Sequence, residues 1–150
     1  MVWARISLGG HIDLHVFHGG TLIGVRYRDE IIDPYVRPCA GAIGTNFILM
    51  DDNARPHRAV VVEGCLEGHG LKRMEWPAQS PDLNPKEHLL GYLGRQVAAL
   101  SPPPRSLDQL EQSLLHVWSF LPISVFENLI DSMESRCRQC NQVRYGHIPY

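Results

Sequence analysis

Two acidic positions in this 150-residue sequence have surroundings that suit the binding of a divalent cation. The first follows the apolar run 47–50 and reads Asp51-Asp52-Asn53. Core packing does not explain two carboxylates after an apolar strand, because burying an unpaired charge is expensive. At the carboxyl end of a strand in an open α/β sheet, a carboxylate lies where ligands usually bind. The alternative is that these three polar residues only turn the chain and cap the next helix.

The second acidic position is Glu87, which follows a constrained approach. Residues 76–85 read WPAQSPDLNP and include three prolines. Proline fixes φ, so the helix that follows starts at a defined place, as a rigid metal site requires. The helix macrodipole also favours a carboxylate in a first turn, which gives Glu87 a purely structural explanation as well.

The blocks DDNARPH (51–57) and WPAQSPDLNPKEH (76–88) resemble the two signature blocks of mariner-superfamily transposases. Those enzymes are DDE/D recombinases with an RNase H-like fold. In that family the aspartate directly before Asn-Ala is a metal ligand, which corresponds to Asp52. The third acid follows Asn-Pro-x and corresponds to Glu87. The 34 residues between them (53 to 86) are typical of the Glu-ending branch, and the resemblance covers essentially the whole chain.

This resemblance implies a reaction and its partners. Two Mg²⁺ or Mn²⁺ ions, roughly 3.5–4 Å apart across a scissile phosphate, would be the only cofactors of the intact enzyme. One would activate water or a DNA 3′-hydroxyl, and the other would stabilise the leaving oxygen. The implied function is cut-and-paste DNA transposition, with transposon-end DNA as partner, a homodimeric parent enzyme, a nuclear location and no membrane.

The family's first acid, in an Asp-Glu-Ser-like block, would precede the first predicted strand and is not among these residues. Asp13 lies on a later strand and is expected to face solvent, not a metal. Asp29, Glu30 and Asp33 are expected on the solvated face of a helix. The family's helix-turn-helix DNA-binding modules would lie further upstream. We therefore expect a fragment of a catalytic domain, truncated at its N-terminal strands and inactive alone.

The elements that position these residues alternate between strands and helices. Runs of β-forming residues at 2–8 and 11–17 flank Gly-Gly and predict a hairpin. The run 47–50 suits a strand buried on both faces, and 71–76 a short strand. Pro34 is expected to bend or end the first helix, and 38–45 to form a loop. Helices are predicted at 25–36, 55–67, 85–100, 106–120 and from 123 to about 140.

This order predicts the α/β class, with an RNase H-like mixed sheet and flanking helices. We expect one partial domain over 1–150, strand-rich at about 2–76 and helical at about 85–145. The net charge is −2, with 14 basic residues, so composition argues against a self-sufficient DNA-binding protein. No apolar run approaches ~18 residues and no signal peptide is visible, which predicts a soluble intracellular protein.

The four cysteines are expected to be reduced and metal-free. Cys137 and Cys140 have C-x2-C spacing, but Cys39 and Cys65 stand singly and no second close pair accompanies them. We therefore favour ordinary free thiols over a zinc site.

Two other functions remain open. One is a non-catalytic, domesticated interaction or scaffold module that keeps the fold. Its surface would lie in the C-terminal helices, although packing in the core is the favoured role for the apolar candidates there, which are Leu110, Leu114, Leu115, Trp118 and Phe126. The other is a different RNase H-like nuclease, which the Trp-Pro and Asn-Pro elements disfavour.

Overall fold

The computed structural model describes residues 1–7, 10–76 and 83–142. They form two compact units. The hairpin unit comprises Met1–Val16 with Pro81–Tyr150, and the central unit comprises Phe17–Ser80. The prediction of one domain over 1–150 is not tested by this division and stays a prediction.

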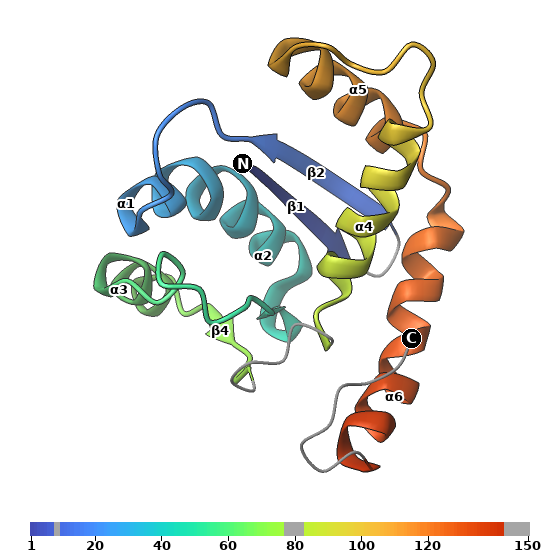
Figure 1. Ribbon diagram of the computed structural model, residues 1–150. Helices are drawn as coiled ribbons and strands as arrows, with labels where there is room; N and C mark the ends of the chain where they lie inside the picture. Colours follow the sequence, from blue (N-terminus) through green and yellow to red (C-terminus); the bar gives the residue numbers. More distant parts are fainter. Residues whose placement is uncertain (8–9, 77–82, 143–150) are drawn as a thin grey trace. The chain divides into compact units, whose positions relative to one another are not determined.

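The hairpin unit begins with two antiparallel strands, β1 (Val2–Ser7) and β2 (Gly10–Val16), drawn in blue in Figure 1. They confirm the predicted hairpin. Arg5 and Asp13 are paired across the strands, and Arg5 Nη2 lies 2.6 Å from Asp13 Oδ2. The Asp13 side chain is only partly exposed, so its expected role as a freely solvated strand residue is replaced by a cross-strand ion pair.

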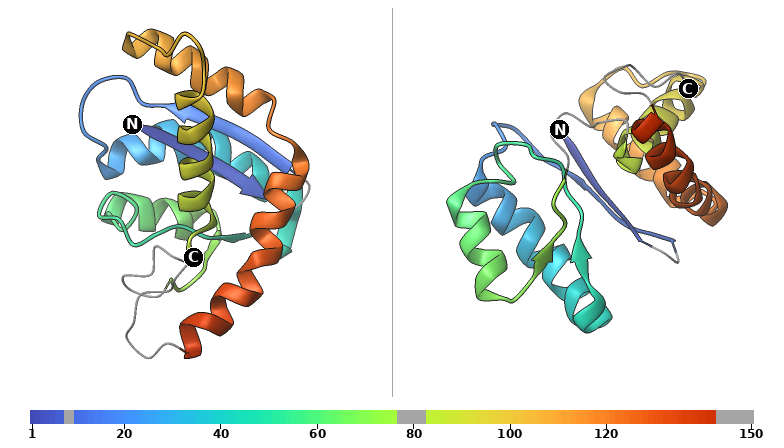
Figure 2. Two further views of the ribbon diagram at one scale, coloured as in Figure 1. Left: turned by 45° about the vertical axis from the view of Figure 1, so that its right-hand side comes forward. Right: turned by 90° about the horizontal axis from the view of Figure 1, so that it is seen from below.

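Three helices pack on this hairpin, and Figure 2 shows them gathered on one face of it. They are α4 (Pro85–Ala98), α5 (Leu107–Ser119) and α6 (Ile123–Gln142), which confirms the three predicted C-terminal helices. Trp118 and Phe126 meet edge to face, with ring centroids 5.8 Å apart, and both are buried. Their predicted packing role is therefore confirmed. For Leu110 and Leu115, which are 37% and 43% exposed, the prediction of core packing is wrong. The buried core of this unit consists of Ala4, Leu89, Leu93, Trp118, Leu121 and Phe126.

No single helix among the described residues is long and apolar enough to cross a membrane. Only α5 and residues 123–141 taken together pass on length and composition, with a bend of 79° between them.

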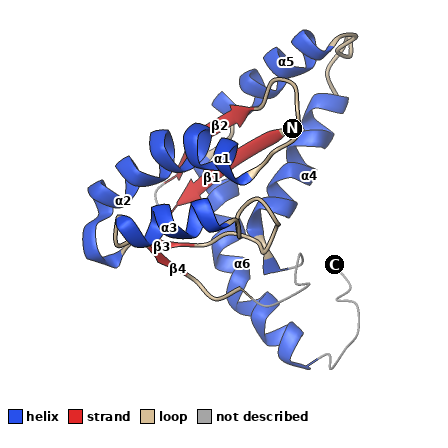
Figure 3. Cartoon of the chain, turned by 90° about the vertical axis from the view of Figure 1, so that its left-hand side faces the viewer, coloured by secondary structure: helices blue, strands red, loops and turns tan. Residues whose placement is uncertain are grey.

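The central unit opens with a continuous helical stretch and ends with a small parallel sheet (Figure 3). Helix α3 packs against the first half of that stretch, and strands β3 and β4 pair side by side. In chain order its elements are α1 (Gly24–Tyr27), η1 (Arg28–Val36), α2 (Arg37–Ile43), η2 (Gly44–Asn46), β3 (Ile48–Leu49), α3 (Val60–Gly68) and β4 (Lys72–Arg73).

The helical stretch continues through Pro34, where the sequence predicted a bend or an end. The segment η1 is a π-helix, whose wider turn relieves the clash between a proline ring and the carbonyl four residues earlier. The predicted loop at 38–45 is also wrong, because α2 occupies most of it. Pro38 lies in the first turn of α2, directly after η1, and Gly44 ends the helix with φ of 77°.

Two further boundaries differ from the prediction. The helix expected from residue 55 begins at Val60, because Ala54 accepts the backbone N–H groups of His57 and Arg58 in a separate turn. The run 47–50 forms only the two-residue β3, and Ile48 is 54% exposed. The prediction of a strand buried on both faces is therefore wrong. Successive strand residues point to opposite faces, and Ile48 projects to the open one.

Candidate metal centre

Asp51, the first of the two adjacent aspartates, is a structural residue of the central unit. Its side chain is 3% exposed, and its Oδ2 lies 3.3 Å from Nε of Arg73. Arg73 Nη2 also donates to the His57 carbonyl (2.9 Å), and Nη1 contacts Glu63. Because Asp51 follows β3 and Arg73 belongs to the parallel strand β4, this ion pair links the ends of the two strands.

Asp52, the predicted metal ligand, is held in place but remains accessible. Its Oδ1 accepts the backbone N–H of Ala54 (3.1 Å) and lies 2.7 Å from Nδ1 of His57. The His57 ring is buried against Tyr27, with ring centroids 4.2 Å apart. The Asp52 side chain is nevertheless 39% exposed, so one carboxylate is fixed in orientation and open to an ion from solvent.

The alternative interpretation, in which residues 51–53 only turn the chain and cap the next helix, is confirmed for the turn and wrong for the cap. The Asp52–Ala54 hydrogen bond turns the chain. Helix α3, however, has Ala59 at its N-cap position and no side-chain cap.

Asn53 connects the Asp52 turn to the start of the second signature block. Its Nδ2 donates to the carbonyl of Trp76 (3.0 Å), and its Oδ1 accepts from Nε of Arg58 (3.1 Å). Trp76 opens the proline-rich block, of which residues 77–82 lie outside the described part of the chain. The two blocks are therefore bonded to each other at Asn53 and Trp76.

Glu87, the other predicted ligand, lies in the first turn of α4 in the hairpin unit. Asn84 precedes this helix, and its side chain is buried and accepts the backbone N–H of Lys86 (3.1 Å). The Asn84 carbonyl accepts the N–H of Glu87 itself (3.1 Å). Pro85 occupies the first helical position, as the sequence predicted. Glu87 is exposed and lies at the positive end of the helix dipole.

Both predicted ligands therefore offer solvent-accessible carboxylate oxygens on defined supports, and oxygen is the donor that Mg²⁺ and Mn²⁺ prefer. Asp52 belongs to the central unit and Glu87 to the hairpin unit. The prediction that the two carboxylates meet at one ion therefore stays a prediction.

The acidic residues of the helical stretch keep side chains that are 34–50% exposed, in agreement with the predicted solvated face. Asp29 and Glu30 form ion pairs with neighbouring arginines. Asp33 pairs with Arg37 and its side chain is 38% exposed, while Cys65 Sγ on helix α3 donates to its Oδ1 at 4.0 Å. The C-x3-H spacing of Cys65 and His69 indicates that these two side chains share a helix face, but it gives no signal for the contact with Asp33.

Comparison with known sequences identifies the family. Residues 22–111, which include Asp52 and Glu87, match the family described as "DDE superfamily endonuclease". The Tcb2 transposase of Caenorhabditis briggsae is 32% identical over 134 residues, which cover 81% of this chain and 48% of that protein. The Tc1 transposase of Caenorhabditis elegans is 34% identical over 113 residues, covering 73% and 40%. The chain thus spans less than half the length of these curated relatives.

Known structures establish the fold. The catalytic domain of Mos1 mariner transposase matches with a TM-score of 0.83 and 21% identity, over 99% of this chain and 75% of that one. The same domain has been solved with raltegravir and Mg, at a TM-score of 0.83, 20% identity, and coverage of 99% and 76%. A Mos1 paired-end complex with the left transposon end has a TM-score of 0.73 and 22% identity, over 87% and 39%.

Family and fold therefore agree. The chain belongs to the DDE superfamily endonucleases, and within them to the Tc1/mariner transposase type. The predicted RNase H-like α/β fold is confirmed.

Proposed function

We propose that this chain is part of the catalytic domain of a cut-and-paste DNA transposase and supplies two of its metal ligands, Asp52 and Glu87. The family match supports this, because it spans both residues in one continuous region. The strongest structural support is the geometry of Asp52. A carboxylate that is oriented by two hydrogen-bonding partners and still 39% exposed suits an ion that arrives from solvent.

In this proposal each residue has a defined task. Divalent ions, when bound, supply the chemistry of phosphodiester cleavage by polarising the phosphate and activating the attacking oxygen. Asp52 presents a ligand oxygen, and His57 fixes its direction through Nδ1. Glu87 presents a second ligand from the start of α4, which Asn84 and Pro85 hold in place.

Transposon-end DNA is the proposed substrate. Support comes from the Mos1 complex with a transposon end, which has the same fold. Action by paired copies of the chain and a location in the nucleus, where such DNA lies, belong to the same proposal. For a polypeptide of these 150 residues alone we expect no appreciable cleavage. It holds two of the three family acids, and its net charge of −2 gives little attraction to DNA.

Calorimetric titration with Mn²⁺ tests the proposed ligands. The parent chain is compared with Asp52→Ala, Glu87→Ala and the control Asp131→Ala, which removes an exposed acid from α6. We expect measurable binding in the parent and the control, and loss of binding in both ligand variants. A parent chain that binds no Mn²⁺ would contradict the proposal and support the alternative, a non-catalytic scaffold module.

A cleavage assay tests the expected inactivity. The chain is incubated with Mg²⁺ or Mn²⁺ and DNA that carries a Tc1/mariner-type terminal repeat. We expect the DNA to remain intact. Nicking at the element terminus, abolished by Asp52→Ala, would contradict the expected inactivity while supporting the assignment of Asp52.

A further inference from the structure

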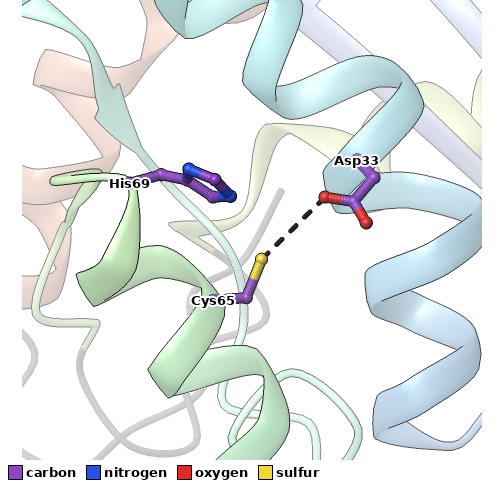
Figure 4. A group of neighbouring side chains, drawn as sticks. All are labelled: Asp33, Cys65 and His69. Carbon is purple, nitrogen blue, oxygen red and sulfur yellow. Dashed lines mark hydrogen bonds between the residues drawn. The ribbon is translucent and has the colours of Figure 1, made fainter.

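We propose a second metal site, independent of the transposase chemistry, formed by Asp33, Cys65 and His69 in the central unit. The bound ion would be Zn²⁺ or a similar transition metal that binds thiolates. One ligand atom from each residue lies within 4.8 Å of the other two. Figure 4 shows the three side chains pointing into a common space from η1 and from the end of α3.

The donor set suits zinc and does not suit magnesium. A thiolate, an imidazole nitrogen and a carboxylate oxygen are the three ligand types that Zn²⁺ accepts in proteins, whereas Mg²⁺ takes oxygen. Cys65 as thiolate and Asp33 as carboxylate carry two negative charges, which a divalent cation would neutralise. Three protein ligands leave a fourth position for water, as in zinc sites that keep an open position.

The geometry requires only a small closure. With usual Zn–S, Zn–N and Zn–O distances, ligand atoms at the corners of a tetrahedron lie roughly 3.3–3.7 Å apart. Cys65 Sγ and Asp33 Oδ1 are already 4.0 Å apart. The widest separation has to shorten by about 1.5 Å at most. The exposed His69 side chain can supply this by rotation.

The position of the site on α3 also favours a cation. Cys65 and His69 are four residues apart, and the His69 N–H donates to the Cys65 carbonyl (3.2 Å) in the last turn of the helix. The carbonyl end of a helix carries partial negative charge. His69 is exposed, so an ion can reach its ring from solvent.

Neighbouring charges set the conditions for binding. Burial, reinforced by Asp33, raises the pKa of the Cys65 thiol, and Asp29 acts in the same direction, whereas Arg37 and Arg28 lower it. Arg37, 2.9 Å from Asp33 Oδ1, competes for the carboxylate, so a bound ion would have to displace this ion pair.

Titration of the reduced, metal-free 150-residue chain with Co²⁺ tests the site, since Co²⁺ replaces Zn²⁺ and gives a thiolate charge-transfer band. We expect one thiolate-bound ion per chain, displaced by Zn²⁺ and not by excess Mg²⁺. Cys65→Ser should lose the band. His69→Ala, at an exposed position that tolerates change, should weaken binding by more than the roughly 10–100-fold cost of losing an outer-shell partner.

The controls separate this site from the other cysteines and from the proposed catalytic ligands. The double variant Cys137→Ser/Cys140→Ser and the variant Asp52→Ala should keep the band unchanged. The proposal is overturned if the parent shows no band, or if the band persists in Cys65→Ser. It is also overturned if the band depends on Cys137 and Cys140. None of these results bears on Mn²⁺ binding by Asp52 and Glu87, so the two proposals fail separately.

Discussion

The two predicted ligands of the catalytic metal are supported in different ways. Asp52 lies in a polar network, in which His57 and the backbone of Ala54 hold its carboxylate. Arg73 stabilises the same turn, because it donates a hydrogen bond to the His57 carbonyl and forms an ion pair with Asp51. Glu87 is positioned differently. Its position follows from the start of α4, which a cap and a proline define.

This difference teaches how each ligand should respond to change. A network of buried charges is sensitive to the loss of one member, because the partner charge stays behind in a poorly solvated place. A helix start is more tolerant, since capping groups contribute one hydrogen bond each. Substitutions around Asp52 should therefore cost more stability and more metal affinity than equivalent substitutions around Glu87.

The largest effect is expected at Arg73. Replacement by Ala removes the arginine from buried Asp51 and should lower the free energy of unfolding by about 3–5 kcal/mol, measured by urea denaturation. The matched control is Arg138→Ala, which breaks an exposed i,i+4 pair with Glu134 and should cost about 0.5 kcal/mol or less. Equal effects of the two substitutions would show that the Asp51–Arg73 pair does not stabilise the turn.

A smaller effect, on metal affinity, is expected at His57. The variant His57→Phe keeps a ring against Tyr27 but removes the nitrogen that contacts Asp52. Affinity for Mn²⁺ should fall roughly 10–100-fold, the usual cost of losing an outer-shell partner. Unchanged Mn²⁺ affinity in a folded variant would exclude a positioning role for His57.

The N-terminal cap of α4 should contribute less to the free energy of unfolding than the Asp51–Arg73 ion pair does. Asn84→Ala removes the acceptor for the Lys86 N–H and should lower the free energy of unfolding by about 0.5–2 kcal/mol. Ser106→Ala at the start of α5 provides the comparison, because Ser106 Oγ accepts the Gln109 N–H at 3.2 Å. The buried Asn84 should cost at least as much as the exposed Ser106. A clearly smaller cost at Asn84 would mean that Pro85, and not the cap, fixes the helix start.

The smallest effect on the free energy of unfolding is expected at Glu87 itself. Glu87→Gln removes the charge that the helix dipole favours and should cost about 0.3–1 kcal/mol at low ionic strength. The loss should fade in high salt, where such interactions are screened. A loss of several kcal/mol, or one that salt does not change, would indicate that Glu87 has a structural role beyond the helix dipole.

The sequence predicted those elements whose determinants are local. The hairpin follows from β-forming runs around Gly-Gly, and α4 and α5 from Pro85 and the Ser106 cap. Prediction failed where tertiary context decides. Pro34 normally ends a helix, but a π-helical turn accommodates it here, and α2 follows where a loop was expected.

The same distinction holds for the sites. Asp52 and Glu87 were found because each lies in a recognisable local block of the sequence. The ion pair of Asp51 with Arg73 was missed, since it depends on the pairing of β3 with β4. The contact of Asp33 with Cys65 was missed because the two residues are 32 positions apart, and only the packing of α3 on η1 brings them together.

Whether Asp52 and Glu87 share an ion is the central question, and anomalous diffraction from crystals of the chain soaked in Mn²⁺ answers it most directly. The account predicts a manganese peak within about 2.0–2.6 Å of an oxygen of each carboxylate. It is contradicted if the two carboxyl groups lie well over ~10 Å apart, or if every peak contacts one of them alone.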